Sequence, residues 1–193
     1  MRFASLKPEC LRATVLAACL AAAATGAAKS EVTFFGLTFP DRIAGAEIEA
    51  STDNEKTTAG LGYRVTYRWP GWSIDVYIYD LGRTSIPGDV GSEVLKSQLR
   101  QAHGDILEVQ RSGVYSNVKL TRSHVMRDSD GRARLDCLDF IYVHETAGPV
   151  DSFLCLAGWH NKFVKFRLTG PRHAGSTAEA KRFLDAWIGI LWP

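Results

Sequence analysis

Apolar and polar side chains alternate through two neighbouring segments, 63–69 and 72–80. In the second, Trp72 to Ile78 places every other apolar residue on one face, while Ser73, Asp75, Tyr77 and Tyr79 share the opposite face. A two-residue period is typical of a strand with one buried and one exposed face. Pro70 and Gly71 separate the two segments and favour a turn. The pattern therefore predicts a β-hairpin.

Further apolar runs predict the remaining strands. Before the hairpin, 32–39 is closed by Pro40 and Asp41, and 46–52 follows it. A glycine- and proline-rich loop is expected over 81–91. Four strands in meander order are then expected at 114–126, 132–144, 150–159 and 162–168, with tight turns near 128–131, 145–147 and 160–161.

Two segments carry apolar residues at helical spacing. Ser92 is a typical helix N-cap, and the period that follows predicts a helix over 92–111. Ser176 or Thr177 can cap a second amphipathic helix over 176–190. Strands, a helix, four strands and a helix in this order indicate an α+β fold, with helices packed on an antiparallel sheet. Because no repeat or linker divides 29–193, we expect a single domain there.

The first 28 residues have the pattern of a secretory signal peptide. Arg2, Lys7 and Arg12 precede an uncharged stretch of mostly alanine that ends near residue 28. Cleavage there predicts a periplasmic or secreted protein with no transmembrane helix in its mature form. An alternative is lipoprotein processing, in which Cys19 would be acylated after the short run Leu16-Ala17-Ala18.

Removal of residues 1–28 leaves two cysteines, Cys137 and Cys155, in an oxidising compartment. They lie at equal distances from residue 146, so a hairpin turning there places them opposite each other on adjacent strands. We expect a structural disulfide, with two buried free thiols as the alternative.

Charge and motifs exclude several classes of function. The formal charge is +2, and it becomes zero without residues 1–28, so nothing favours nucleic acid or an anionic membrane. The five histidines are too far apart for a local metal motif, and neither a nucleophile elbow nor a nucleotide-binding loop occurs. We therefore predict no catalytic residue, no metal ligand and no cofactor.

The one unusual cluster is aromatic, because six tyrosines and tryptophans fall within 63–79. Tyr63, Tyr67 and Trp72 are expected to pack in the core. Tyrosine and tryptophan are enriched where proteins contact partners. We therefore select Trp69, Tyr77 and Tyr79 as partner-binding candidates, provided that their face of the hairpin is open.

The sequence resembles the PsbP-like group, which includes extrinsic photosystem II subunits, Ran-binding Mog-type proteins and bacterial envelope proteins of the DcrB type. The resemblance spans about residues 33–191 and depends on the order of the elements and on short sequences within the predicted strands. These sequences are Phe35 to Pro40, Val76 to Asp80, Gly158-Trp159 and Phe163 to Thr169. It implies an α/β/α sandwich around a central antiparallel sheet that binds other proteins.

By elimination, we expect a non-catalytic exported protein that binds a protein or a cell-envelope component. One alternative is an envelope hydrolase acting on peptidoglycan, glycan or ester, which a pocket with converging His and Asp would favour. Another is a periplasmic inhibitor or immunity protein, for which the loop 81–91 should protrude.

Overall fold

The structure is a computed structural model that describes residues 32–193. The predicted signal peptide over 1–28 and the alternative acylation of Cys19 lie outside the described residues. No helix within 32–193 is long and apolar enough to cross a membrane. The elements are β1 (Val32–Phe34), β2 (Leu37–Phe39), β3 (Arg42–Ile43), β4 (Ala46–Asp53), β5 (Tyr63–Trp69), β6 (Trp72–Tyr79), α1 (Glu93–Arg111), β7 (Tyr115–Arg127), β8 (Ala133–His144), β9 (Gly148–Trp159), β10 (Lys162–Pro171) and α2 (Ser176–Leu191).

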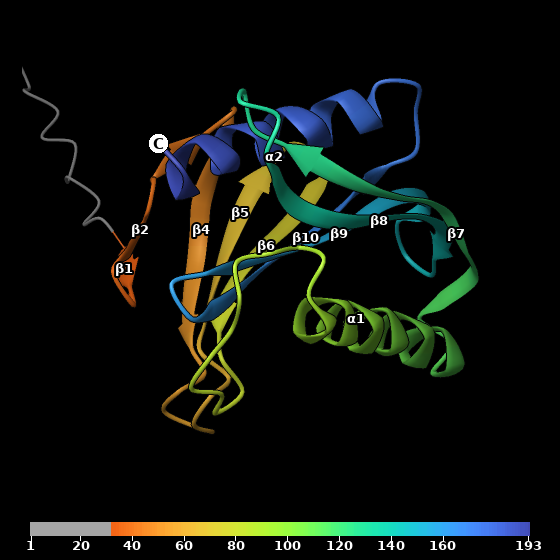
Figure 1. Cartoon of the computed structure of the whole chain (residues 1–193). Coiled ribbons are helices and arrows are strands. Elements are labelled where there is room, and N and C mark those ends of the chain that lie inside the picture. The colour runs from red at the N-terminus through yellow and green to blue at the C-terminus, as the bar shows by residue number, and fades with distance from the viewer. Residues whose placement is uncertain (1–31) are drawn as a thin grey trace, which may run out of the picture.

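Eight strands form one sheet in the order β3-β4-β5-β6-β10-β9-β8-β7, and every neighbouring pair is antiparallel. Two meanders make up this sheet, β3 to β6 before α1 and β7 to β10 after it (Figure 1). The pairing of β6 with β10 joins them. The predicted hairpin is present, with Trp69 opposite Trp72 in β5 and β6.

The predicted single strand over 32–39 is wrong in one respect, because the chain reverses within it. Phe35 and Gly36 have φ values of 52° and 81°, and they turn β1 back onto β2 as a separate two-stranded sheet. Phe34 then stacks on Tyr63 of β5, with ring centroids 3.8 Å apart. Apolar composition alone does not separate one long strand from a tight hairpin of two short ones.

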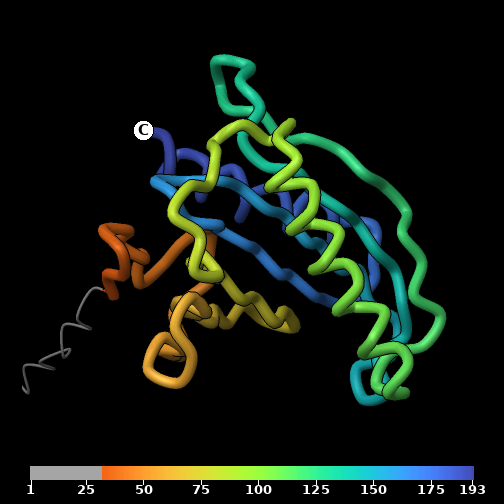
Figure 2. Tube along the Cα trace, turned by 60° about the horizontal axis from the view of Figure 1, so that its bottom comes forward, coloured from red at the N-terminus to blue at the C-terminus, as the bar shows by residue number. Residues whose placement is uncertain are grey.

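One helix covers each face of the sheet, which confirms the α/β/α sandwich (Figures 1 and 2). Leu95, Leu99, Ala102 and Ile106 of α1 are buried in a cluster with Leu138, Phe140 and Leu154. The apolar stripe of α2 packs on the opposite face, where Trp187 is fully buried and contacts Phe39, Tyr67 and Phe166. Side chains of one strand alternate between these two clusters, as the pleat requires.

The helix boundaries follow the sequence closely at α1 and less closely at α2. Ser92 is the N-cap of α1, and its hydroxyl accepts a hydrogen bond from the backbone N–H of Leu95 at 3.4 Å. At α2 the N-cap is Gly175, and Ser176 is the first helical residue. Ser176 does not cap the helix, and its hydroxyl lies within hydrogen-bonding distance of the Asp151 carboxylate and the carbonyl of His173, to one of which it donates.

Cys137 of β8 and Cys155 of β9 form the predicted disulfide. They are directly opposite in the strand register, and their Cα atoms are 4.1 Å apart. Both are buried in the cluster beneath α2. The disulfide therefore ties the two central strands of the second meander at the face on which α2 packs.

We expect the disulfide to stabilise the fold by restricting the unfolded chain. The cysteines are 18 residues apart, and closing a loop of this size contributes about 3 kcal/mol to the free energy of unfolding. Urea denaturation of the oxidised protein and of the Cys137→Ala, Cys155→Ala double variant measures this difference. Equal midpoints for the two proteins would contradict the prediction.

Candidate functional site

The three aromatic candidates do not form one patch. Trp69 lies on the α2 side of the sheet, where it stacks on Trp72 with ring centroids 5.6 Å apart. The guanidinium of Arg182 in α2 lies 5.1 Å above its ring. Tyr77 and Tyr79 are on the opposite face, so no single flat partner surface contains all three.

α1 covers Tyr79 but leaves Tyr77 partly open. Tyr79 is only 5% exposed, and its hydroxyl accepts a hydrogen bond from Gln98 Nε2 of α1 at 3.1 Å. Burial raises its pKa. Tyr77 is half-buried, and the ammonium of Lys165 lies 4.2 Å from its ring centroid. Burial, and then the nearby Asp75 carboxylate, raise the pKa of Tyr77.

The loop 81–91 packs against the end of the β9–β10 hairpin. Ile86 and Val90 are buried, and the backbone N–H of Ile86 donates to Asn161 Oδ1 at 3.5 Å. Gly158 is essential to this contact, because a Cβ placed on it would lie 1.9 Å from the carbonyl oxygen of Pro87. Ile86 and Val90 therefore anchor the loop to the protein interior, whereas Leu81 at its start is exposed.

Beside α1, one face of β5, β6 and β10 carries mainly polar side chains. The strand register arranges nine side chains in three rows across these strands, and we name them the open face. The rows are Arg64, Tyr77 and Lys165; Thr66, Asp75 and Arg167; and Arg68, Ser73 and Thr169.

The open face is positively charged, since it carries four basic residues and one acidic residue. The acidic residue, Asp75, already has partners. Its Oδ1 accepts a hydrogen bond from the Thr66 hydroxyl at 2.6 Å and lies 3.9 Å from Arg64 Nε. The remaining positive charge is available to a negatively charged molecule.

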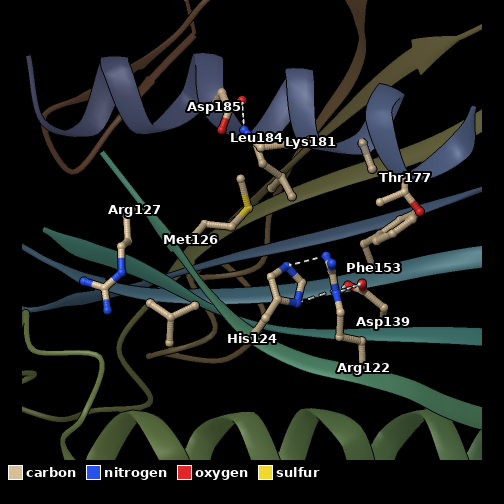
Figure 3. A pocket seen from close by; sticks show the side chains of 12 residues that line it. Arg122, His124, Met126, Arg127, Asp139, Phe153, Thr177, Lys181, Leu184 and Asp185 are labelled. Carbon is tan, nitrogen blue, oxygen red and sulfur yellow. Dashed lines mark hydrogen bonds and ion pairs between the residues drawn. The ribbon is translucent and has the colours of Figure 1, made fainter. Parts of the chain in front are cut away.

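A pocket of about 430 Å³ lies on the other side of the sheet, between α2 and the outer strands β7 and β8 (Figure 3). Its walls are largely apolar, and its polar side chains come both from the sheet and from α2. The lining residues are Arg122, His124, Val125, Met126, Arg127, Asp139, Phe153, Thr177, Ala180, Lys181, Leu184 and Asp185.

Three polar side chains converge in this pocket. Arg122 Nε donates to Asp139 Oδ2 at 2.9 Å, and Arg122 Nη2 lies 3.0 Å from His124 Nε2. A guanidinium can only donate, so His124 Nε2 accepts and the ring proton is on Nδ1. That nitrogen is 3.7 Å from Asp139 Oδ1. Burial lowers the pKa of His124, and this effect outweighs the opposing effect of the Asp139 carboxylate.

This arrangement does not prepare His124 for proton abstraction. A general base needs a ring nitrogen with a free lone pair directed at the substrate. In His124, Arg122 occupies the lone pair of Nε2, and Nδ1 carries the proton. Among the lining residues that the structure describes, the only hydroxyl is that of Thr177. The pocket is thus equipped to bind a ligand and holds no activated nucleophile.

No sequence motif grouped Arg122, His124 and Asp139, because Asp139 lies on a different strand from the other two. The β7–β8 register places Arg122 opposite Asp139 and His124 opposite Cys137. The expected turn at 128–131 could have revealed this pairing approximately. Irregularities in the pairing near residues 116–122 prevent an accurate register from sequence.

Three solved structures are similar to this chain, each with 14% sequence identity. The solution structure of cyanobacterial PsbP from Synechocystis sp. PCC 6803 matches with a TM-score of 0.49, over 78% of this chain and 82% of its own. A protein of unknown function from Pseudomonas aeruginosa matches with a TM-score of 0.35, over 79% and 91%. A mutant of the protein Mog1 matches with a TM-score of 0.34, over 84% and 88%.

No family model matches the sequence, and no curated protein matches it significantly. PsbP and Mog1 are names within the group that the short strand sequences resemble. At this identity the similarity concerns the fold alone.

The lowered pKa of His124 predicts a loss of stability in acid. Above its unfolded-state value of 6.5 the ring is neutral in both states, and its contribution is fully present. As the pH falls below 6.5, the unfolded chain binds the proton first, and stability is lost until the pH passes the folded-state pKa.

Thermal unfolding of the wild type and of His124→Gln between about pH 7.5 and about pH 5 tests this expectation. The melting temperature of the wild type should decrease more than that of the variant over this range, because glutamine does not titrate. Identical pH dependence of the two melting temperatures would show that protonation of His124 does not destabilise the folded protein.

Proposed function

We propose that this protein is an exported, non-catalytic binding protein that docks an acidic protein partner on the open face. The observation that carries the proposal is the uncovered half of one sheet face, where basic side chains outnumber acidic ones by four to one. Complementary charge steers association and selects among partners. Tyr77 supplies an aromatic side chain at the centre strand of the three.

Location and chemistry support the same proposal. The disulfide is suited to the oxidising periplasm or extracellular space, to which the leader pattern would direct the chain. In the 430 Å³ pocket, Arg122 occupies the acceptor nitrogen of His124, so this histidine is not arranged as a general base.

Variants on the open face should lose the partner. Tyr77→Ala removes the aromatic contact, and Arg68→Glu reverses an exposed charge, so each should weaken capture of an acidic partner from envelope or secreted fractions by about tenfold or more. Quantitative mass spectrometry of proteins retained on immobilised wild type and variants provides the measurement.

Arg182→Glu is the matched control, because it reverses an exposed charge on α2, on the opposite side of the sheet. A partner lost from both open-face variants but kept by the control supports the proposal. A partner lost only from the Arg182 variant, or a basic partner, would place the docking surface elsewhere.

The convergence of His124 and Asp139 in one pocket is the observation that favours a second candidate, an envelope hydrolase. A screen of peptidoglycan, glycan and ester substrates tests it. Turnover that disappears in His124→Ala, while that variant stays folded, would support the hydrolase over the binding protein. The inhibitor or immunity alternative gains no support from the loop 81–91, because Ile86 and Val90 anchor it to the protein interior.

A further inference from the structure

Two small cavities lie where the open face meets α1 and the start of β7. One has a volume of about 250 Å³ and is lined by Ser73, Thr169 and His144 among others. The other has a volume of about 150 Å³ and is lined by Tyr77 and Lys165 among others. Tyr115 and Arg167 line both, so the guanidinium side chain stands between the two cavities.

Arg167 is an incompletely satisfied cation. Its Nη2 donates a hydrogen bond to the hydroxyl of Tyr142 at 3.2 Å. Its Nη1 is buried and, within residues 32–193, has no hydrogen-bond partner. A buried donor that lacks an acceptor costs free energy, and the cost is larger for a charged group. An acceptor brought in by a ligand would remove this cost.

Lys165 is a second cation without a counter-ion. It lies two residues from Arg167 on the same face of β10, and it forms no salt bridge with any residue that the structure describes. The rings of Tyr77 and Tyr79 lie 4.2 Å and 5.6 Å from its ammonium and stabilise it in part. Burial lowers the pKa of Lys165, and the nearest acidic residue of α1, Asp105, opposes that effect.

Other polar and aromatic groups surround the two cations. The rings of Tyr115 and Tyr142 stack with centroids 4.3 Å apart, and Tyr142 is the residue that binds Arg167 Nη2. Asp75, opposite Arg167 in the register, accepts from Thr66 and faces Arg64. Asp75 lines the larger cavity and Asp105 lines the smaller one, and within residues 32–193 neither forms a salt bridge with Lys165 or Arg167. The two cations therefore keep hydrogen-bonding capacity for a negatively charged ligand.

We infer that Lys165 and Arg167 form a binding site for the oxyanion group of a small molecule, a carboxylate or a phosphate. An arginine beside a lysine is a common arrangement for such groups, because guanidinium and ammonium make charge-assisted hydrogen bonds to them. The cavity that both cations line has a volume of about 150 Å³. This exceeds the volume of several water molecules, at about 30 Å³ each, and so leaves room for either group. The inference does not require the acidic protein partner proposed above.

Calorimetric titration of the full protein with sodium phosphate and, separately, with sodium acetate in a low-chloride buffer tests the site. We expect saturable binding of at least one anion, and the anion that binds more tightly identifies the preferred group. Amide NMR shifts should locate the binding at Tyr77, Tyr115 and Arg167. Absence of saturable binding for both anions would overturn the inference.

Two variants and a control complete the experiment. Arg167→Gln and Lys165→Met each remove one cation and should weaken anion binding by about tenfold or more. The methionine keeps an unbranched stem over Tyr77, so this variant remains informative if Arg167→Gln does not fold. Arg182→Gln removes an exposed charge from α2 and should bind the anion as the wild type does. Equal weakening in all three would indicate a general charge effect and contradict a defined site.

This experiment separates the site from the docking proposal. If the wild type binds the anion while the Tyr77→Ala and Arg68→Glu variants still capture their partner, the anion site stands. The docking of a protein partner on the open face is then refuted. Loss of partner capture in these variants, together with no response to phosphate or acetate, would refute the anion site alone.

Discussion

The antiparallel pairing of β6 with β10 is the constraint on which the rest of the structure depends. It joins two meanders that are separated by α1 in the sequence, and it makes one continuous sheet of eight strands. The same pairing sets Tyr77 beside Lys165 and Asp75 beside Arg167. A shift of this register by one residue would turn Lys165 and Arg167 toward the buried face beneath α2. Fold and candidate site thus share one interaction.

The two helices cover the sheet unequally, and this difference produces the open face. α2 lies on the cluster that extends from β3 to β9, and the disulfide holds the strands beneath it. α1 packs mainly on β8, β9 and part of β10, because its buried residues meet Leu138, Phe140 and Leu154. Beyond that area the α1 side of β5 and β6 carries mainly polar side chains, of which Arg68 and Ser73 are exposed.

The pocket beside α2 shows that proximity of a histidine and a carboxylate does not by itself make a catalytic pair. His124 and Asp139 lie 3.7 Å apart at their nearest nitrogen and oxygen, yet Arg122 binds both of them. A guanidinium that donates a hydrogen bond to the imidazole nitrogen occupies the lone pair that a general base would use, and its positive charge opposes protonation of the ring. The arrangement links β7 to β8 through side chains and forms part of the polar lining of the pocket.

The sequence by itself determined the local elements of this protein. A two-residue period specifies a strand face and a helical period specifies a buried stripe, so the hairpin at 63–79 and the two helices were predicted close to their observed bounds. The equal spacing of Cys137 and Cys155 about one turn also predicted their disulfide, because a hairpin relates its residues by simple symmetry. These features depend on neighbours along the chain.

Only the tertiary structure decided which faces are covered and which distant residues meet. Alternation placed Tyr77 and Tyr79 on one face, but the position of α1 buries Tyr79 and leaves Tyr77 partly open. Lys165 meets Tyr77, and Arg122 meets Asp139, through strand pairings that no local pattern encodes. The physical reason is that periodicity records the environment of each side chain, whereas the identity of its neighbours follows from the packing of the whole chain.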